Sequence, residues 1–140
     1  TQGEAACFEI SPGGWDEVRP VNGCVVHTNH FLCESLSAQQ SPMGLALSSA
    51  PRLVSGQRHA DAVAQGQRIG FDALQNFLRD ESDGLWSICR SPDPSVPPES
   101  RVESVAGIIM QTQPPAMWVA CDVPSRVAFE AVPLAKPVRL

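Results

Sequence analysis

The sequence predicts an α+β fold in which an antiparallel sheet packs on helices, and three features lead to this prediction. Short runs typical of strands dominate the first third of the chain, a helical stretch follows, and further strand-like runs fill the last third. Strands grouped before and after helices, rather than alternating with them, are typical of this fold class. Hydrophobic residues make up 43% of the 140 positions and charged residues 18%, so a buried core can form.

The first third predicts a hairpin and a third strand. Residues 6–10 and 15–19 flank a Ser-Pro-Gly-Gly turn and are the two expected strands of the hairpin. A second turn precedes residues 24–30, which we expect to be the third strand. Residues 32–52 are rich in Ser, Ala, Gln and Pro without a clear period, so they predict a long surface loop.

The middle of the chain predicts two helices. Ser55 is the expected N-cap of a helix that runs from Gly56 towards Gln67. Gly70 then interrupts the helical pattern. An apolar stripe at helical spacing indicates the second helix: Phe71, Leu74, Phe77 and Leu78.

The last third predicts four strands. Residues 85–90 form a short one, and residues 91–100 connect it to the next through a stretch with four prolines. Residues 102–111 are apolar on both faces, as a central strand covered on both sides requires. Residues 116–123 and 127–134 complete the expected sheet.

Composition narrows the range of partners and compartments. The net charge is −5 and no cluster of Lys or Arg occurs, which argues against nucleic acid as a partner. No apolar run approaches the roughly 18 residues of a membrane span. The five cysteines are odd in number and irregular in spacing, which favours reduced thiols and a cytoplasmic location.

A His-Thr-Asn-His motif at residues 27–30 allows three interpretations. His27 and His30, with Cys33 after them, could ligate a metal, but residues i and i+3 of a strand point to opposite faces and no further ligands complete the set. Cys24 or Cys33 could instead form a nucleophilic pair with one of the histidines. In the third interpretation, Asn29 and His30 only satisfy hydrogen bonds at the end of a strand.

Together with Ser-Ile-Cys-Arg at residues 87–90, this motif resembles the penicillin acyltransferase family. The family is also known as acyl-CoA:6-aminopenicillanic acid acyltransferase or peptidase C45, and it belongs to the N-terminal-nucleophile (Ntn) hydrolases. The resemblance covers nearly the whole chain, because further segments occur in the family's order: residues 8–12, 22–23, 58–80, 107–110 and 117–120. The chain departs from the family at Ser91, where close relatives often have His or Ala, so the substrate preference stays open.

The resemblance implies a fold and a set of site residues. Residues 1–140 would be one segment, the C-terminal half of an Ntn-hydrolase domain with a four-layer αββα sandwich. Asn29 would donate to the oxyanion, an interaction typically worth ~3 kcal/mol. Arg90 would favour the thiolate of the nucleophile or bind a carboxylate, although charge alone favours an ordinary salt bridge at a strand end. His27 and His30 would belong to the substrate-binding part of the site.

The family's nucleophile is a cysteine freed by self-cleavage well upstream of these motifs, and no residue of this chain occupies that place. We therefore expect a partner segment or subunit that carries the cysteine, together with a small amide or acyl substrate. No metal or organic cofactor is implied, and acyl-CoA is one acyl donor that such an enzyme could use. The chain begins with Thr1 rather than Met, which fits a piece of a longer protein.

Two residues of this chain are less suitable as terminal nucleophiles. Gly23-Cys24 is the dipeptide that the family cleaves, but Cys24 lies within the strand expected to deliver Asn29 to the site. Thr1 has its own amine as a base, but the resemblance places it at an ordinary connection between strands. Two other hypotheses remain: an inactive truncated domain that only folds or dimerises, and a self-contained Cys–His hydrolase.

Overall fold

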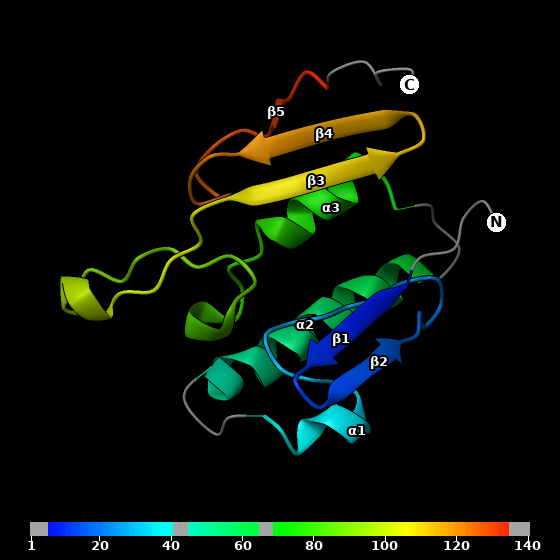
Figure 1. The fold of residues 1–140 in the computed structure, drawn as a ribbon. Coiled ribbons are helices and arrows are strands. Elements are labelled where there is room, and N and C mark those ends of the chain that lie inside the picture. The colour runs from blue at the N-terminus through cyan, green and yellow to red at the C-terminus, as the bar shows by residue number, and fades with distance from the viewer. Residues whose placement is uncertain (1–5, 41–44, 65–68, 135–140) are drawn as a thin grey trace. The chain divides into compact units, whose positions relative to one another are not determined.

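The computed structural model describes residues 6–40, 45–64 and 69–134, and the chain divides into two compact units, Thr1–Arg68 and Ile69–Leu140. Each unit combines helix with antiparallel strands (Figure 1). The α+β class expected from the sequence is therefore present in both units. In the described ranges, no helix has the length and apolar character needed to cross a lipid bilayer.

The first unit begins with the predicted hairpin. Strands β1 (Cys7–Ser11) and β2 (Gly14–Val18) pair antiparallel in a register that runs from Cys7 opposite Val18 to Ser11 opposite Gly14. Gly14 has a φ of 143°, a conformation that favours glycine, and this allows the tight turn between the strands. Two helices follow, α1 (Glu34–Ser37) and α2 (Leu45–Ala64). The Ser35 hydroxyl on α1 donates to Asp16 Oδ2 on β2 at 2.6 Å and so holds α1 beside the hairpin.

The predicted third strand at residues 24–30 is wrong. An isolated bridge between Val21 and Cys24 closes a tight turn, and the chain beyond it is irregular. Asn22 and Gly23 occupy the left-handed region in this turn, with φ of 52° and 77°. The backbone and side chains that follow bond to the Glu9 carboxylate of β1 and to the hydroxyl and carbonyl of Ser49 on α2 rather than to a neighbouring strand, so no ladder forms.

The predicted loop at residues 32–52 and the N-cap at Ser55 are also wrong. Residues 34–37 form α1, and α2 begins at Leu45, eleven residues before the predicted start. Ser55 lies inside α2 and is buried rather than exposed at a helix end. The end predicted near Gln67 lies outside the described residues. Serines and Pro51 hid this helix from the sequence pattern because they are poor helix formers.

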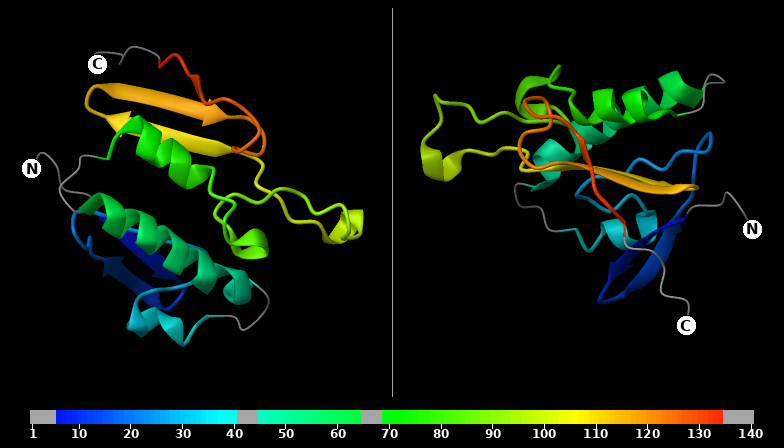
Figure 2. Two further views of the ribbon diagram at one scale, coloured as in Figure 1. Left: turned by 180° about the vertical axis from the view of Figure 1, so that it is seen from behind. Right: turned by 90° about the horizontal axis from the view of Figure 1, so that it is seen from above.

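The second unit contains one helix and a three-stranded antiparallel sheet. Helix α3 (Phe71–Leu78) carries the predicted apolar stripe, and the sheet has the order β3 (Gly107–Thr112), β4 (Pro115–Ala120), β5 (Glu130–Ala131). Figure 2 shows α3 along one face of β3 and β4. The core consists of buried side chains from the sheet and the following segment, with partly buried side chains of α3 against them: Ile109, Ala120, Phe129, Phe71, Leu74 and Leu78.

Arg79, the C-cap of α3, connects the helix to the segment after β4. Its Nε donates to the Pro124 carbonyl and its Nη2 to the Val127 carbonyl, both at 2.9 Å. The guanidinium also lies 5.5 Å from the centre of the Phe129 ring. These contacts fix α3 on the sheet at its C-terminal end.

In the second unit, one predicted strand is absent, and another is present but open on one face. Residues 85–90 form no strand: a short 3-10 helix, η1 (Gly84–Trp86), is followed by irregular chain, and a second one, η2 (Pro98–Ser100), lies in the proline-rich connection. The strand predicted over 102–111 is not covered on both faces. Ile109 is 4% exposed, but Ile108 and Met110 are 53% and 71% exposed, so β3 alternates between a buried and an open face.

Candidate functional site

An open hollow of about 400 Å³ lies beside β1 in the first unit. Three of the residues predicted to form the site, His27, Asn29 and His30, line it together. The remaining residues of its wall come from β1, the segment after the motif and the end of the α1 region: Cys7, Phe8, Glu9, Ile10, Phe31 and Gln40. The structure thus gathers most of the predicted site around one concave surface.

Glu9, on β1, lines this hollow and holds the chain around the motif by hydrogen bonds. Its carboxylate is 4% exposed and accepts three hydrogen bonds: from His27 Nε2 at 2.7 Å, from the Leu32 N–H at 2.6 Å and from the Cys33 N–H at 2.8 Å. Burial raises the pKa of Glu9, but the hydrogen bonds from Leu32, Cys33 and His27 outweigh it and lower the pKa to about 2. Glu9 is therefore ionised, and His27 must carry its proton on Nε2.

Cys33 is a poor nucleophile in this setting. Burial raises the pKa of its thiol to about 11, and the adjacent Glu9 carboxylate contributes to the increase. The thiolate, which is the reactive form, is therefore scarce near neutral pH. The self-contained Cys–His hydrolase is not supported at this cysteine.

Asn29 is held in one orientation by α2. Its backbone N–H donates to Ser49 Oγ at 2.7 Å, and its Oδ1 accepts from Arg52 Nη2 at 2.7 Å. Arg52 is itself fixed, because its Nε donates to the Ser48 carbonyl at 3.1 Å. A guanidinium has only donors, so the amide oxygen must face Arg52 and the NH2 group must point away from it. No described residue accepts a hydrogen bond from Asn29 Nδ2.

His30 is oriented by the same serine. Its Nδ1 lies 2.8 Å from Ser49 Oγ, whose hydroxyl donates to Thr28 Oγ1 at 2.9 Å, and Thr28 donates to the Ser49 carbonyl at 3.1 Å. A second hydroxyl, Thr28 Oγ1, lies 3.2 Å from the same ring nitrogen. Ser49, on α2, is 0% exposed and contacts both Asn29 and His30 of the motif.

The fourth predicted residue, Arg90, belongs to the second unit and has separate surroundings. Its backbone N–H donates to Ser104 Oγ at 3.0 Å, and the Ser104 N–H donates to its carbonyl at 2.9 Å. The side chain is half-buried, and its Nε is buried without a hydrogen-bond partner in the described part of the chain. Among these residues it forms no salt bridge, so the alternative of an ordinary strand-end ion pair is not seen.

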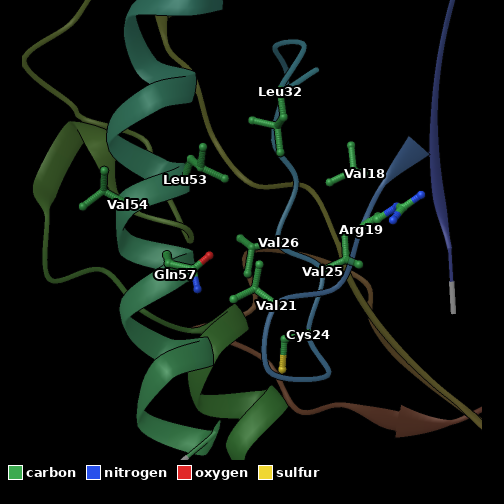
Figure 3. Close-up of a pocket in the computed structure, with 10 residues that line it drawn as sticks. All are labelled: Val18, Arg19, Val21, Cys24, Val25, Val26, Leu32, Leu53, Val54 and Gln57. Carbon is green, nitrogen blue, oxygen red and sulfur yellow. The ribbon is translucent and has the colours of Figure 1, made fainter. Parts of the chain in front are cut away.

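A second hollow of about 300 Å³ lies on the other side of the motif segment. Figure 3 shows it between α2 and the irregular chain after β2, with Leu53 and Gln57 on the helix and Cys24 on the turn. Aliphatic side chains make up most of its wall: Val18, Val21, Val25, Val26, Leu32, Leu53 and Val54. Cys24 therefore lines a different hollow from His27 and His30, which argues against the alternative of a nucleophilic pair between Cys24 and one of these histidines.

Several residues of the site were not found from the sequence. Glu9, Gln40, Ser49 and Arg52 hold or line the hollow from β1, the end of the α1 region and α2. Only Glu9 fell within a segment that carried the family resemblance. The contacts of Ser49 and Arg52 depend on a helix in a region that the sequence predicted as loop.

No match was found when the chain was compared with protein-family models, with curated proteins and with solved structures. The described residues also contain no group of three or more His, Cys, Asp or Glu side chains placed to hold a metal ion. The function is therefore inferred from the geometry of the hollow and from the sequence motifs.

Proposed function

We propose that this chain is the C-terminal portion of a cysteine-type Ntn amidohydrolase or acyltransferase similar to the penicillin acyltransferase family. The reaction breaks an amide bond through an acyl-thioester on a cysteine that a separate upstream segment supplies. The observation that supports this most is the orientation of Asn29, whose amide oxygen accepts from Arg52 while its NH2 group is left for a ligand. Its position beside an open hollow with His27 and His30 gives a substrate access.

The chemical role of Asn29 follows from its fixed dipole. When a nucleophile attacks an amide carbonyl, negative charge develops on the oxygen, and a preoriented N–H stabilises it without reorganising. Removing one such donor typically lowers the rate by ~10² to 10³-fold. His27 and His30 form the neighbouring wall for the substrate. For Arg90, the family resemblance implies a role in binding a carboxylate or stabilising the thiolate.

The nucleophile is assigned to a partner because the family resemblance places it upstream, and because Cys33 and Cys24 suit the task poorly. Cys33 has a pKa of about 11, and Cys24 lines the other hollow. The open faces of both sheets also fit a larger assembly, since Phe8 and Ile10 on β1 are exposed, as are Ile108 and Met110 on β3. Apolar sheet faces of this kind are covered by a second sheet in an αββα sandwich. The reaction needs no metal or organic cofactor, and acyl-CoA is one acyl donor it could use.

A second candidate is a catalytically inactive domain that folds or dimerises without performing chemistry. The open face of β3 favours it, because two copies could cover this face for each other. The two candidates differ in their partner: the enzyme needs a cysteine-bearing segment, and the inactive domain needs only another copy of this chain.

An assay of the native protein, with any chain that accompanies it, tests the enzyme. We expect hydrolysis of small acyl p-nitroanilides and a loss of ~10²-fold in kcat in Asn29→Ala, with a smaller change in KM. Gln39→Ala is the matched control because this exposed amide lies outside the lining of the hollow. No turnover across a broad acyl panel, or equal rates in wild type and Asn29→Ala, would overturn the proposal.

A further inference from the structure

The hollow beside β1 contains a second side-chain amide that is oriented like Asn29. Gln40 lines the hollow, and its Oε1 accepts a hydrogen bond from the Phe31 N–H at 2.8 Å. A backbone N–H can only donate, so the amide oxygen of Gln40 is fixed towards Phe31 and its NH2 group is directed elsewhere. No residue in the described ranges accepts a hydrogen bond from Gln40 Nε2. Two amides therefore border one hollow, each bound through its oxygen.

The remaining polar groups of the wall leave few acceptors. The carboxylate of Glu9 already receives the hydrogen bonds of His27, Leu32 and Cys33. Ser49 Oγ receives the Asn29 N–H and faces His30 Nδ1. A polar group left in a hollow without a partner is costly when a ligand removes its water. The hollow consequently presents N–H donors that a ligand with oxygen acceptors would satisfy.

We propose that this hollow binds a carboxylate, with Asn29 Nδ2 and Gln40 Nε2 as its two side-chain donors. A carboxylate has two oxygens and only accepts, so it complements two NH2 groups. The guanidinium of Arg52, which lies 2.7 Å from Asn29 Oδ1, adds positive charge beside the donors. Glu9 keeps its negative charge, and its carboxylate oxygens are occupied by the N–H groups of His27, Leu32 and Cys33.

The assignment adds a residue and a ligand class to the proposed function. It depends on that function only for the origin of the ligand: hydrolysis of an amide releases a carboxylate, which the hollow would hold as product. Gln40 then contributes the second donor to the oxygens of the reacting carbon. Binding itself requires no nucleophile, so it can be measured on this chain alone.

The test is a titration of the ¹⁵N-labelled chain with benzoate, followed by the side-chain NH2 signals of Asn29 and Gln40 in NMR spectra. Benzamide is the neutral counterpart with the same ring and one carbonyl oxygen. We expect saturable shifts of both NH2 pairs with benzoate and weaker binding of benzamide. Gln40→Glu keeps the oxygen that accepts from Phe31 but replaces the NH2 group with a second oxygen. It should weaken benzoate binding by at least about tenfold.

Gln39→Glu is the matched control, since it makes the same change of charge at the neighbouring position outside the hollow. Its benzoate affinity should stay within about twofold of wild type. Benzoate that leaves both NH2 pairs unshifted would overturn the inference even if no variant folds. Equal weakening by Gln39→Glu and Gln40→Glu would overturn it as well. If benzamide binds as tightly as benzoate, the hollow is not a carboxylate site. The proposed amide hydrolysis is not affected by that result, because the hydrolysis assay tests it separately.

Discussion

At the scale of single residues, side chains of the site are oriented by neighbours that can only donate, or only accept, hydrogen bonds. Arg52 can only donate, so it turns the Asn29 amide with its NH2 group outward. Ser49 receives the Asn29 N–H and orients His30. Glu9 binds His27 and two backbone N–H groups, which keeps it ionised although it is buried. The motif histidines and asparagine are thus held by residues from distant parts of the sequence.

The pH dependence of the free energy of unfolding should reveal the contribution of the ionised Glu9 carboxylate. Its pKa is about 2 in the folded chain and near 4.3 in an unfolded one, so folding is stabilised on the order of 3 kcal/mol above about pH 4.5. This stabilisation is lost as the pH falls from about 4.5 towards 2. Glu9→Gln should lower the free energy of unfolding at pH 7 and flatten its acid dependence. Denaturant titrations at several pH values measure both effects.

The exposed Glu34 gives the control for this experiment, and Glu34→Gln should retain the acid dependence of wild type. A Glu9→Gln variant that loses stability on acidification as steeply as wild type would show that another carboxyl is responsible.

Thiol reactivity should separate the cysteines. With a pKa of about 11, Cys33 has only about 0.1% thiolate at pH 8, whereas Cys121 is exposed. Iodoacetamide at pH 8 should therefore modify Cys121 long before Cys33, as peptide mass spectrometry would record. Glu9→Gln removes the neighbouring negative charge and should increase the rate at Cys33. Equal rates at Cys33 and Cys121 in wild type would contradict the account.

At the scale of elements, the sequence correctly predicted the strands and the helix that are defined by a pattern among neighbouring residues. The β1–β2 hairpin and helix α3 were correct because a turn between strand-like runs and an apolar stripe at helical spacing define them. The strand predicted at 24–30 was wrong because polar groups of residues 27–31 bond to Glu9, Ser49 and Gln40 rather than to a strand. Long-range contacts of this kind leave no period in the sequence. For the same reason the sequence indicated Asn29 but not Arg52, which orients it.

The hydrogen bonds between α2 and the His-Thr-Asn-His motif should depend on the Ser49 hydroxyl. Ser49→Ala leaves the Asn29 N–H without its partner at a fully buried position and removes the shorter of the two contacts of His30 Nδ1, so it should cost about 1–3 kcal/mol of stability. Ser48→Ala, one position earlier on α2 and half-buried, is the control. Chemical denaturation measures the difference. Equal stability of Ser49→Ala and wild type would mean that the motif is held in another way.

At the scale of the whole molecule, each unit has a helix, an antiparallel sheet and an open apolar sheet face. The candidate residues are distributed over both units, with Asn29 in the first and Arg90 in the second. The orienting contacts of Asn29 are present, while Cys33 has a raised pKa and Cys24 lines the other hollow. The proposed function assigns the nucleophile to a partner segment, as the family resemblance implies.

The most direct test is an intact-mass spectrum of the native protein after incubation with an activated ester such as p-nitrophenyl acetate, recorded under denaturing conditions. The account predicts a second, stoichiometric chain that begins with cysteine and carries one acetyl group, with this chain unmodified at Cys7, Cys24 and Cys33. A spectrum that contains this chain alone, or that places the acetyl group on one of these three cysteines, would contradict it.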